Sequence, residues 1–172
     1  KYVKVLLTGE GADEIFGGYP RYYICKLGSY FFRLGPSSKK IILHTLGLLQ
    51  ERRVKKLRSF LGKNDKELVL MNAEFVSPDK VRKTLNHEKP DISQRVELLE
   101  KTWNPNLDLM DNLLVFEQSS YLQTILLRQD KMSMAASIES RVPILDNQMI
   151  SLASSISAKR KINYLQPKHL FK

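Results

Sequence analysis

The chain opens with a short run of apolar residues and then becomes a series of amphipathic segments. The run is Val3–Leu7, and its β-branched and leucine side chains are typical of a buried strand. Apolar residues then recur at helical spacing over 21–34, and Gly35 followed by Pro36 breaks this pattern. The pattern predicts one strand followed by a mainly helical chain.

Helix start and stop signals predict further helices between residues 37 and 107. The expected starting points are Ser37 or Ser38, Asp65, Ser77 before Pro78, and Asp91 or Ser93. The segment 51–61 is basic and amphipathic. That composition is more typical of a solvated helix face than of a helix that binds nucleic acid or a membrane. We therefore expect a helical region without chemistry of its own.

The last third of the chain predicts one long helix and then shorter elements. Asp108 is placed to cap a helix that runs through Leu127 into 128–136. Beyond it we expect a break at Pro143, a helix over 147–155 capped by Asp146, and a helix over 164–171 with Pro167 in its first turn.

Composition describes an ordinary globular protein with an excess of positive charge. The 172 residues are 42% hydrophobic and 27% charged, which suffices for one domain with a core. No apolar run is long enough to span a membrane, and the start does not resemble a signal peptide. The single cysteine, Cys25, rules out an internal disulfide and fits the cytoplasm. A net charge of +10 is compatible with nucleic acid, a membrane surface or nucleotide phosphates as partners. It is equally compatible with a piece of a longer protein, which we expect because the chain starts inside a strand pattern.

The first candidate site is the acidic glycine-containing stretch that follows the strand. Thr8–Glu14 carries the carboxylates of Glu10, Asp13 and Glu14 among glycines. Open α/β sheets place ligands where a buried strand ends and turns into a helix. A metal ion or a basic partner would balance this charge. An acidic turn in which Asp13 caps a helix explains the residues equally well.

Charged residues also gather in the last third of the chain. Arg128, Asp130 and Lys131 stand between an apolar helix and small residues. Glu139 and Arg141 are two residues apart, so they would share one side of an extended segment. A structural ion-pair network is the competing interpretation for this pair.

One lysine occupies an electrostatically unfavourable position. Lys168 falls in the first turn of the predicted helix over 164–171, where the helix dipole favours anions. The position hints at an anionic partner, and a solvated lysine is the alternative.

Three stretches together resemble the synthetase domain of the glutamine-dependent asparagine synthetases, which are ATP-pyrophosphatase enzymes. They are 6–19, 128–146 and 167–170, and 56–61 also resembles the extended insertion of longer bacterial members. The pyrophosphate-binding loop S-G-G-x-D-S and the N-terminal glutaminase domain of that family do not occur in this sequence, and Cys25 is not the glutaminase nucleophile. Thr8 stands where many members carry serine, which keeps the hydroxyl.

The resemblance implies a mainly α chain that is the C-terminal part of an α/β domain of the Rossmann-like adenine-nucleotide-hydrolase type, with one residual parallel strand. The implied divisions are a strand and signature loop over 3–19, a helical insertion over about 20–107, and helices over 108–172 that support the active site. Without neighbours such a strand has open edges, so we expect the isolated chain to be marginally stable or prone to aggregate.

The resemblance also implies a two-step reaction that uses ATP and Mg²⁺. ATP adenylates the side-chain carboxylate of aspartate and releases pyrophosphate. Ammonia, made from glutamine by the glutaminase domain, then displaces AMP to give asparagine. The resemblance assigns catalysis to Glu10 and Lys168, nucleotide contacts to Thr8 and Gly9, and Mg²⁺ to Asp13, with Arg128, Asp130, Lys131, Glu139 and Arg141 as supporting residues.

Two other functions stay open at this stage. A related amide ligase could act on another carboxylate in surface polysaccharide, peptide or β-lactam biosynthesis. A basic helical module could instead bind nucleic acid or a protein without catalysis. We expect the full-length protein to be a cytoplasmic homodimer that binds neither nucleic acid nor membrane. We also expect Glu10, Asp13 and Lys168 to converge on one cleft. The piece alone is expected to make no asparagine.

Overall fold

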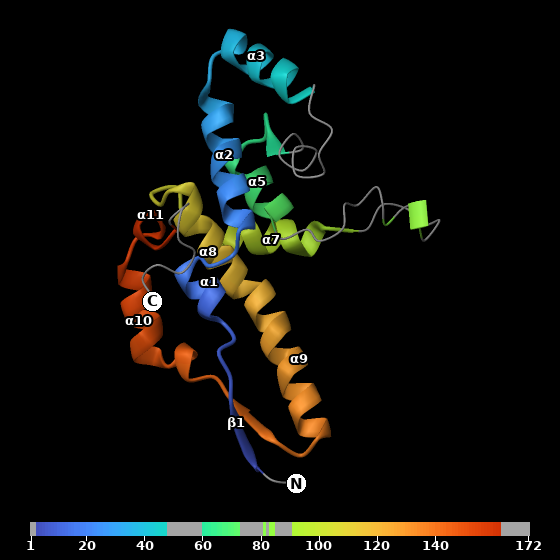
Figure 1. Cartoon of the computed structure of the whole chain (residues 1–172), viewed down its shortest axis with the longest axis vertical. Coiled ribbons are helices and arrows are strands. Elements are labelled where there is room, and N and C mark those ends of the chain that lie inside the picture. The colour runs from blue at the N-terminus through green and yellow to red at the C-terminus, as the bar shows by residue number, and fades with distance from the viewer. Residues whose placement is uncertain (1–2, 48–59, 73–80, 82, 85–90, 163–172) are drawn as a thin grey trace. The chain divides into compact units, whose positions relative to one another are not determined.

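The structure is a computed structural model that describes residues 3–47, 60–72, 81, 83–84 and 91–162 (Figure 1). The chain forms two compact units. The first unit joins residues 1–20 to residues 104–172, and the second unit covers residues 21–103. The candidate chemistry of the sequence falls in the first unit.

The first unit contains the strand predicted at the start of the chain and the elements predicted in its last third. Its elements are β1 (Val5–Leu7), α1 (Ala12–Phe16), α8 (Leu109–Ser119), α9 (Tyr121–Ala135), β2 (Glu139–Arg141), the 3₁₀ helix η1 (Pro143–Leu145), α10 (Asn147–Ser155) and α11 (Ala158–Lys161).

The two strands of the first unit pair in parallel, although more than 130 residues separate them in sequence. Val5 lies opposite Glu139, and Leu7 lies opposite Arg141. The ladder continues beyond the strands, because Thr8 N donates to Arg141 O at 2.9 Å. Helix α9 precedes β2 and packs against it (Figure 1).

The structure confirms the predicted fold class, a mainly helical part of an α/β domain, and its described residues form a two-stranded parallel sheet. The predicted strand over Val3–Leu7 is shorter than expected and is not alone, because β2 pairs with it. Its side chains are also exposed rather than buried. A sheet of two strands, which is all that the described residues form, leaves both faces of β1 poorly covered.

The single long helix predicted from Asp108 is wrong, because the structure divides it into α8 and α9. Ser120 has φ −124° and ψ −75°, so it leaves the helical region. Its hydroxyl donates to Phe116 O at 2.6 Å, which competes with the backbone ladder. The cap itself is confirmed, since the Asp108 carboxylate accepts bonds from the amides of Met110 and Asp111.

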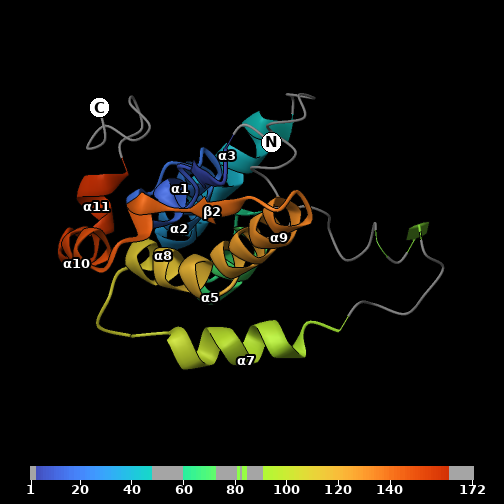
Figure 2. The same ribbon diagram turned by 90° about the horizontal axis from the view of Figure 1, so that it is seen from below.

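Helix α1 is held by a small apolar core. Ile15 and Phe16 of α1 are buried together with Ala153 of α10. The partly buried side chains around them are Ile144, Leu145 and Met149. Helix α1, which is part of the signature stretch, is therefore anchored to η1 and α10 (Figure 2). Asp146 caps α10 as predicted, with its carboxylate accepting from Gln148 N at 3.0 Å.

The regular elements of the second unit are all helices among its described residues. Its helices are α2 (Arg21–Arg33), α3 (Pro36–Gly47), α5 (Asp65–Asn72) and α7 (Ser93–Thr102). The break at Gly35 and the starts near Asp65 and Ser93 are confirmed, whereas α3 begins at Pro36 rather than after a serine cap. Gly28 lets α2 approach α5, since a Cβ there would lie 2.9 Å from Leu68 Cδ2.

Some predictions fall where nothing is described. The basic segment lies mostly outside the described residues, as do the predicted helix start at Ser77 and the helix over 164–171. Cys25 is buried and forms no disulfide, as expected for a structural cysteine. Among the described helices, none has both the length and the apolar character needed to cross a membrane.

Candidate functional site

The signature loop runs from the end of β1 into α1, and the backbone conformation of Gly11 determines its path. Gly11 is the N-cap of α1 with φ 86°, a left-handed conformation that favours glycine. A Cβ on Gly11 would lie 2.6 Å from Leu145 Cδ2 of η1. Asp13 lies inside the first turn of α1 and not at its cap, so the capping interpretation of Asp13 is wrong.

The loop presents its carboxylates at different depths. Gly9 and Glu10 are exposed, Asp13 is half-buried and Glu14 is buried. A Cβ on Gly9 would meet no atom within 4 Å, so the backbone there borders open space. An exposed backbone with an adjacent carboxylate at the carboxyl end of a parallel strand is a suitable place for a ligand.

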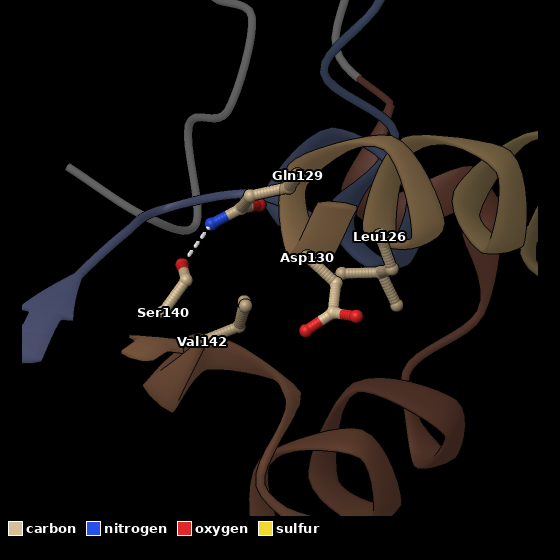
Figure 3. Close-up of a pocket in the computed structure, with 5 residues that line it drawn as sticks. All are labelled: Leu126, Gln129, Asp130, Ser140 and Val142. Atoms are coloured by element: carbon tan, nitrogen blue, oxygen red, sulfur yellow. Dashed lines mark hydrogen bonds between the residues drawn. The ribbon is translucent and has the colours of Figure 1, made fainter. Parts of the chain in front are cut away.

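The Thr8 hydroxyl at the end of β1 is fixed from a distant helix. Gln129 Nε2 of α9 donates to Thr8 Oγ1 at 2.7 Å. The same nitrogen also donates to Ser140 Oγ of β2, as Figure 3 shows. A pocket of about 190 Å³ lies beside these contacts, and its lining residues are Leu126, Gln129, Asp130, Ser140 and Val142. Sequence reasoning missed Gln129 and Ser140, although both lie inside the stretch that carries the resemblance.

The Gln129 side chain is not optimised for stability alone. Its amide oxygen is buried and has no hydrogen-bond partner among the described residues. A buried polar atom without a partner costs about 1–3 kcal/mol. The two hydrogen bonds that the amide nitrogen donates to Thr8 and Ser140 offset this cost.

The charged residues predicted to support the site on α9 contribute one side chain to this region. Asp130 lines the pocket beside Gln129. Arg128 and Lys131 are exposed on α9. The structure gives neither of these cations an ion pair with a described residue, so their supporting role stays a prediction.

Glu139 and Arg141 lie on one side of β2, as expected for an extended segment. Arg141 Nε donates to Glu139 Oε1 at 2.8 Å. The hydrogen bond and the charge of Glu139 raise the pKa of the Arg141 guanidinium. Both side chains are mostly exposed, so the pair serves as a surface ion pair on the strand.

A buried carboxylate ties the end of the signature loop to α1. Glu14 is 1% exposed, and its Oε1 accepts the Tyr19 hydroxyl at 2.7 Å. The Tyr19 ring meets Tyr121 of α9 edge to face, with centroids 6.0 Å apart. Burial and the bond to Glu14 raise the pKa of Tyr19 well above its usual range. Sequence reasoning considered Glu14 only as part of an acidic loop, whereas its side chain is structural.

The substitution Tyr19→Phe is expected to lower the free energy of unfolding by about 1–3 kcal/mol, because buried Glu14 loses a hydrogen-bond donor. Wild-type stability is expected to fall as the pH rises above about 10, where the unfolded tyrosine loses a proton that the folded one keeps. In Tyr19→Phe this alkaline loss is smaller. Urea denaturation between pH 7 and 11 measures both effects. The exposed Tyr30 provides the control Tyr30→Phe, and an equal effect of both substitutions would contradict the prediction.

A second buried charge fixes α11. The side chain of Lys161 is buried near Asp111 of α8, whose carboxylate accepts Ala158 N at 2.6 Å. Burial lowers the pKa of Lys161, and the Asp111 carboxylate partly opposes this. These contacts hold the last described helix against α8. Lys168 itself lies outside the described residues, so its convergence with Glu10 and Asp13 stays a prediction.

Fold and loop geometry together indicate a candidate ligand site at the carboxyl end of a parallel strand, in a mainly helical chain. Comparison with protein families makes the class specific: the model described as asparagine synthase matches residues 1–172, and the chain belongs to this family. No solved structure matches the chain.

Several curated relatives are similar to this chain. Asparagine synthetase [glutamine-hydrolyzing] 1 of Bacillus subtilis is 31% identical over 175 residues, which are 100% of this chain and 28% of the relative. A putative asparagine synthetase [glutamine-hydrolyzing] of Mycobacterium bovis is 31% identical over 98% of this chain and 26% of its own length. Asparagine synthetase [glutamine-hydrolyzing] 3 of Bacillus subtilis is 30% identical over 92% of this chain and 21% of its own length. The chain thus spans about a quarter of these relatives.

Proposed function

We propose that this chain supplies part of the active site of an ATP-dependent ligase that converts aspartate into asparagine. The family match and the names of the relatives support this proposal. The observation that carries it is the signature loop, where Glu10 is exposed and Asp13 half-buried at the carboxyl end of β1. In this proposal both carboxylates would serve one ligand, together with the Thr8 hydroxyl that Gln129 fixes.

In the first proposed step, an oxygen of the aspartate side chain attacks the α-phosphorus of ATP. The bond from this phosphorus to the bridging oxygen breaks, and pyrophosphate leaves with the bonding electrons. Thr8 and the open backbone at Gly9 would contact the AMP moiety, since no neighbouring atom blocks approach at Gly9. Lys168 would balance the charge on the phosphates.

Mg²⁺ is compatible with Asp13. Carboxylate oxygens are the donors that Mg²⁺ prefers, and it is usually held by one or two carboxylates together with phosphate oxygens and water. The described residues contain no group of three or more His, Cys, Asp or Glu that could hold a metal by itself. Asp13 would therefore share the ion with the nucleotide, and the ion would neutralise phosphate charge.

In the second proposed step, ammonia derived from glutamine attacks the acyl carbon and AMP leaves. Glu10 is exposed, so its carboxylate is accessible to a substrate. Glu10 would orient the substrate and accept a proton as the nitrogen forms its new bond. Positioned general bases of this kind contribute roughly 10²–10⁴-fold to a rate.

The test is exchange of labelled pyrophosphate into ATP by the intact polypeptide that carries this chain. We expect exchange that depends on aspartate, and asparagine once ammonia or glutamine is added. Exchange with another carboxylate in place of aspartate would identify a different amide ligase. Failure of every carboxylate to support ATP turnover would favour a non-catalytic module.

A further inference from the structure

The Thr8 hydroxyl is controlled by a side chain that no motif assigns. Gln129 Nε2 lies 2.7 Å from Thr8 Oγ1 and also donates to Ser140 Oγ (Figure 3). An amide nitrogen carries two hydrogens, so it can serve one hydroxyl on each strand. One side chain of α9 therefore bridges the ends of β1 and β2.

The hydrogen bond from Gln129 determines which further hydrogen bonds the Thr8 hydroxyl can form. A hydroxyl has one hydrogen to donate and two lone pairs to accept with. Because Thr8 Oγ1 accepts from Gln129, its own hydrogen is left for another acceptor. Thr8 is half-buried and precedes Gly9, where the backbone borders open space. The acceptor can therefore be an oxygen of a ligand in that space.

Few other contacts orient this hydroxyl. The main-chain bond from Thr8 N to Arg141 O fixes the backbone at the end of β1 but not the side-chain rotamer. The three side chains of β1 are exposed, so apolar packing does little to hold the strand end. Among the described residues, the hydrogen bond from Gln129 is the contact made to the hydroxyl itself.

We propose that Gln129 is a positioning residue that keeps the Thr8 hydroxyl as a hydrogen-bond donor toward a ribose or phosphate oxygen of the nucleotide. The inference rests on the proposed function, because that function places AMP at Thr8. In this role Gln129 acts on the nucleotide through Thr8. Its amide also aligns Ser140 at the pocket that Asp130 lines.

A double-mutant cycle tests this role through the dissociation constant of ATP, measured by calorimetry on the intact polypeptide. Thr8→Val removes the donor, and Gln129→Met removes the amide while keeping the side-chain length. We expect each single variant to bind ATP roughly 3–10-fold more weakly. The double variant should bind no more weakly than Thr8→Val, because the hydroxyl that Gln129 orients is gone. Multiplying effects would overturn the proposal.

A second substitution keeps the test decisive if Gln129→Met folds poorly. Gln129→Glu preserves the shape, but its ionised carboxylate can only accept, so it would turn the Thr8 hydrogen away from the nucleotide. We expect a larger loss of ATP affinity than in Gln129→Met, about tenfold. Because the added charge is partly buried, it also lowers stability, so the affinities are compared at a temperature at which both variants are folded. Gln123→Glu adds the same charge at an exposed position of α9 and should leave ATP binding unchanged. Equal losses at 123 and 129 would show a charge effect only and overturn the inference.

The outcomes separate this inference from the proposed function. If aspartate-dependent pyrophosphate exchange occurs but Thr8→Val leaves ATP affinity unchanged, the role of Gln129 fails and the ligase remains. If exchange fails with aspartate, the proposed function fails, whatever the cycle shows.

Discussion

Glu10→Gln is expected to lower the rate of asparagine formation by the intact polypeptide about 10²–10⁴-fold, the range for loss of a general base. The amide keeps the shape of the side chain but cannot take a proton from the attacking ammonia. Adenylation does not need that proton transfer, so exchange of pyrophosphate into ATP should persist. The measurement compares exchange with asparagine formation in the same preparation.

The matched control for Glu10→Gln is Glu97→Gln. Glu97 is exposed on α7, where it pairs with Lys101, and it has no proposed role in the reaction. We expect the control to retain both activities. Loss of exchange and amide formation to the same extent in Glu10→Gln would place Glu10 in substrate binding rather than in the second step.

Ile15→Ala is expected to lower the free energy of unfolding by about 2–5 kcal/mol, as buried isoleucine truncations do. Ile15 is 2% exposed and lies in the core that packs α1 against η1 and α10. Loosening this core also frees the first turn of α1, which carries Asp13. ATP affinity should therefore fall together with stability.

Leu152→Ala is the control for this prediction, because Leu152 is an exposed leucine on α10. It should change stability by less than about 0.5 kcal/mol, as surface substitutions usually do. Urea denaturation followed by circular dichroism measures both variants. A small effect of Ile15→Ala would show that α1 is not held by this core.

The features that could be predicted from sequence are those with local causes. Asp108 and Asp146 cap α8 and α10 because a carboxylate reaches amides two or three residues ahead, and that geometry needs no distant partner. Gly35 and Pro36 end α2 by the same kind of local constraint. The family resemblance was likewise visible in contiguous stretches, and the match over the whole chain confirms it.

Features that depend on long-range pairing were not predictable in this way. Nothing within 139–141 distinguishes a three-residue strand from a loop until β1 lies beside it. The break at Ser120 was also missed, because the apolar spacing continues across it and serine occurs inside many helices.

The candidate site likewise combines features that local sequence determines with features that depend on long-range contacts. Local sequence placed Glu10 and Asp13 in one short stretch between the strand and the first helix, where glycine at position 11 sets the turn. The fixing of Thr8 by Gln129 required two residues 121 positions apart to meet, and the burial of Glu14 required α1 to pack on its neighbours. Backbone conformation and capping act over a few residues, so the amino-acid order alone determines them. Hydrogen bonds between distant side chains exist only after the chain has closed those long loops, so the folded arrangement determines which hydroxyl or carboxylate faces a ligand.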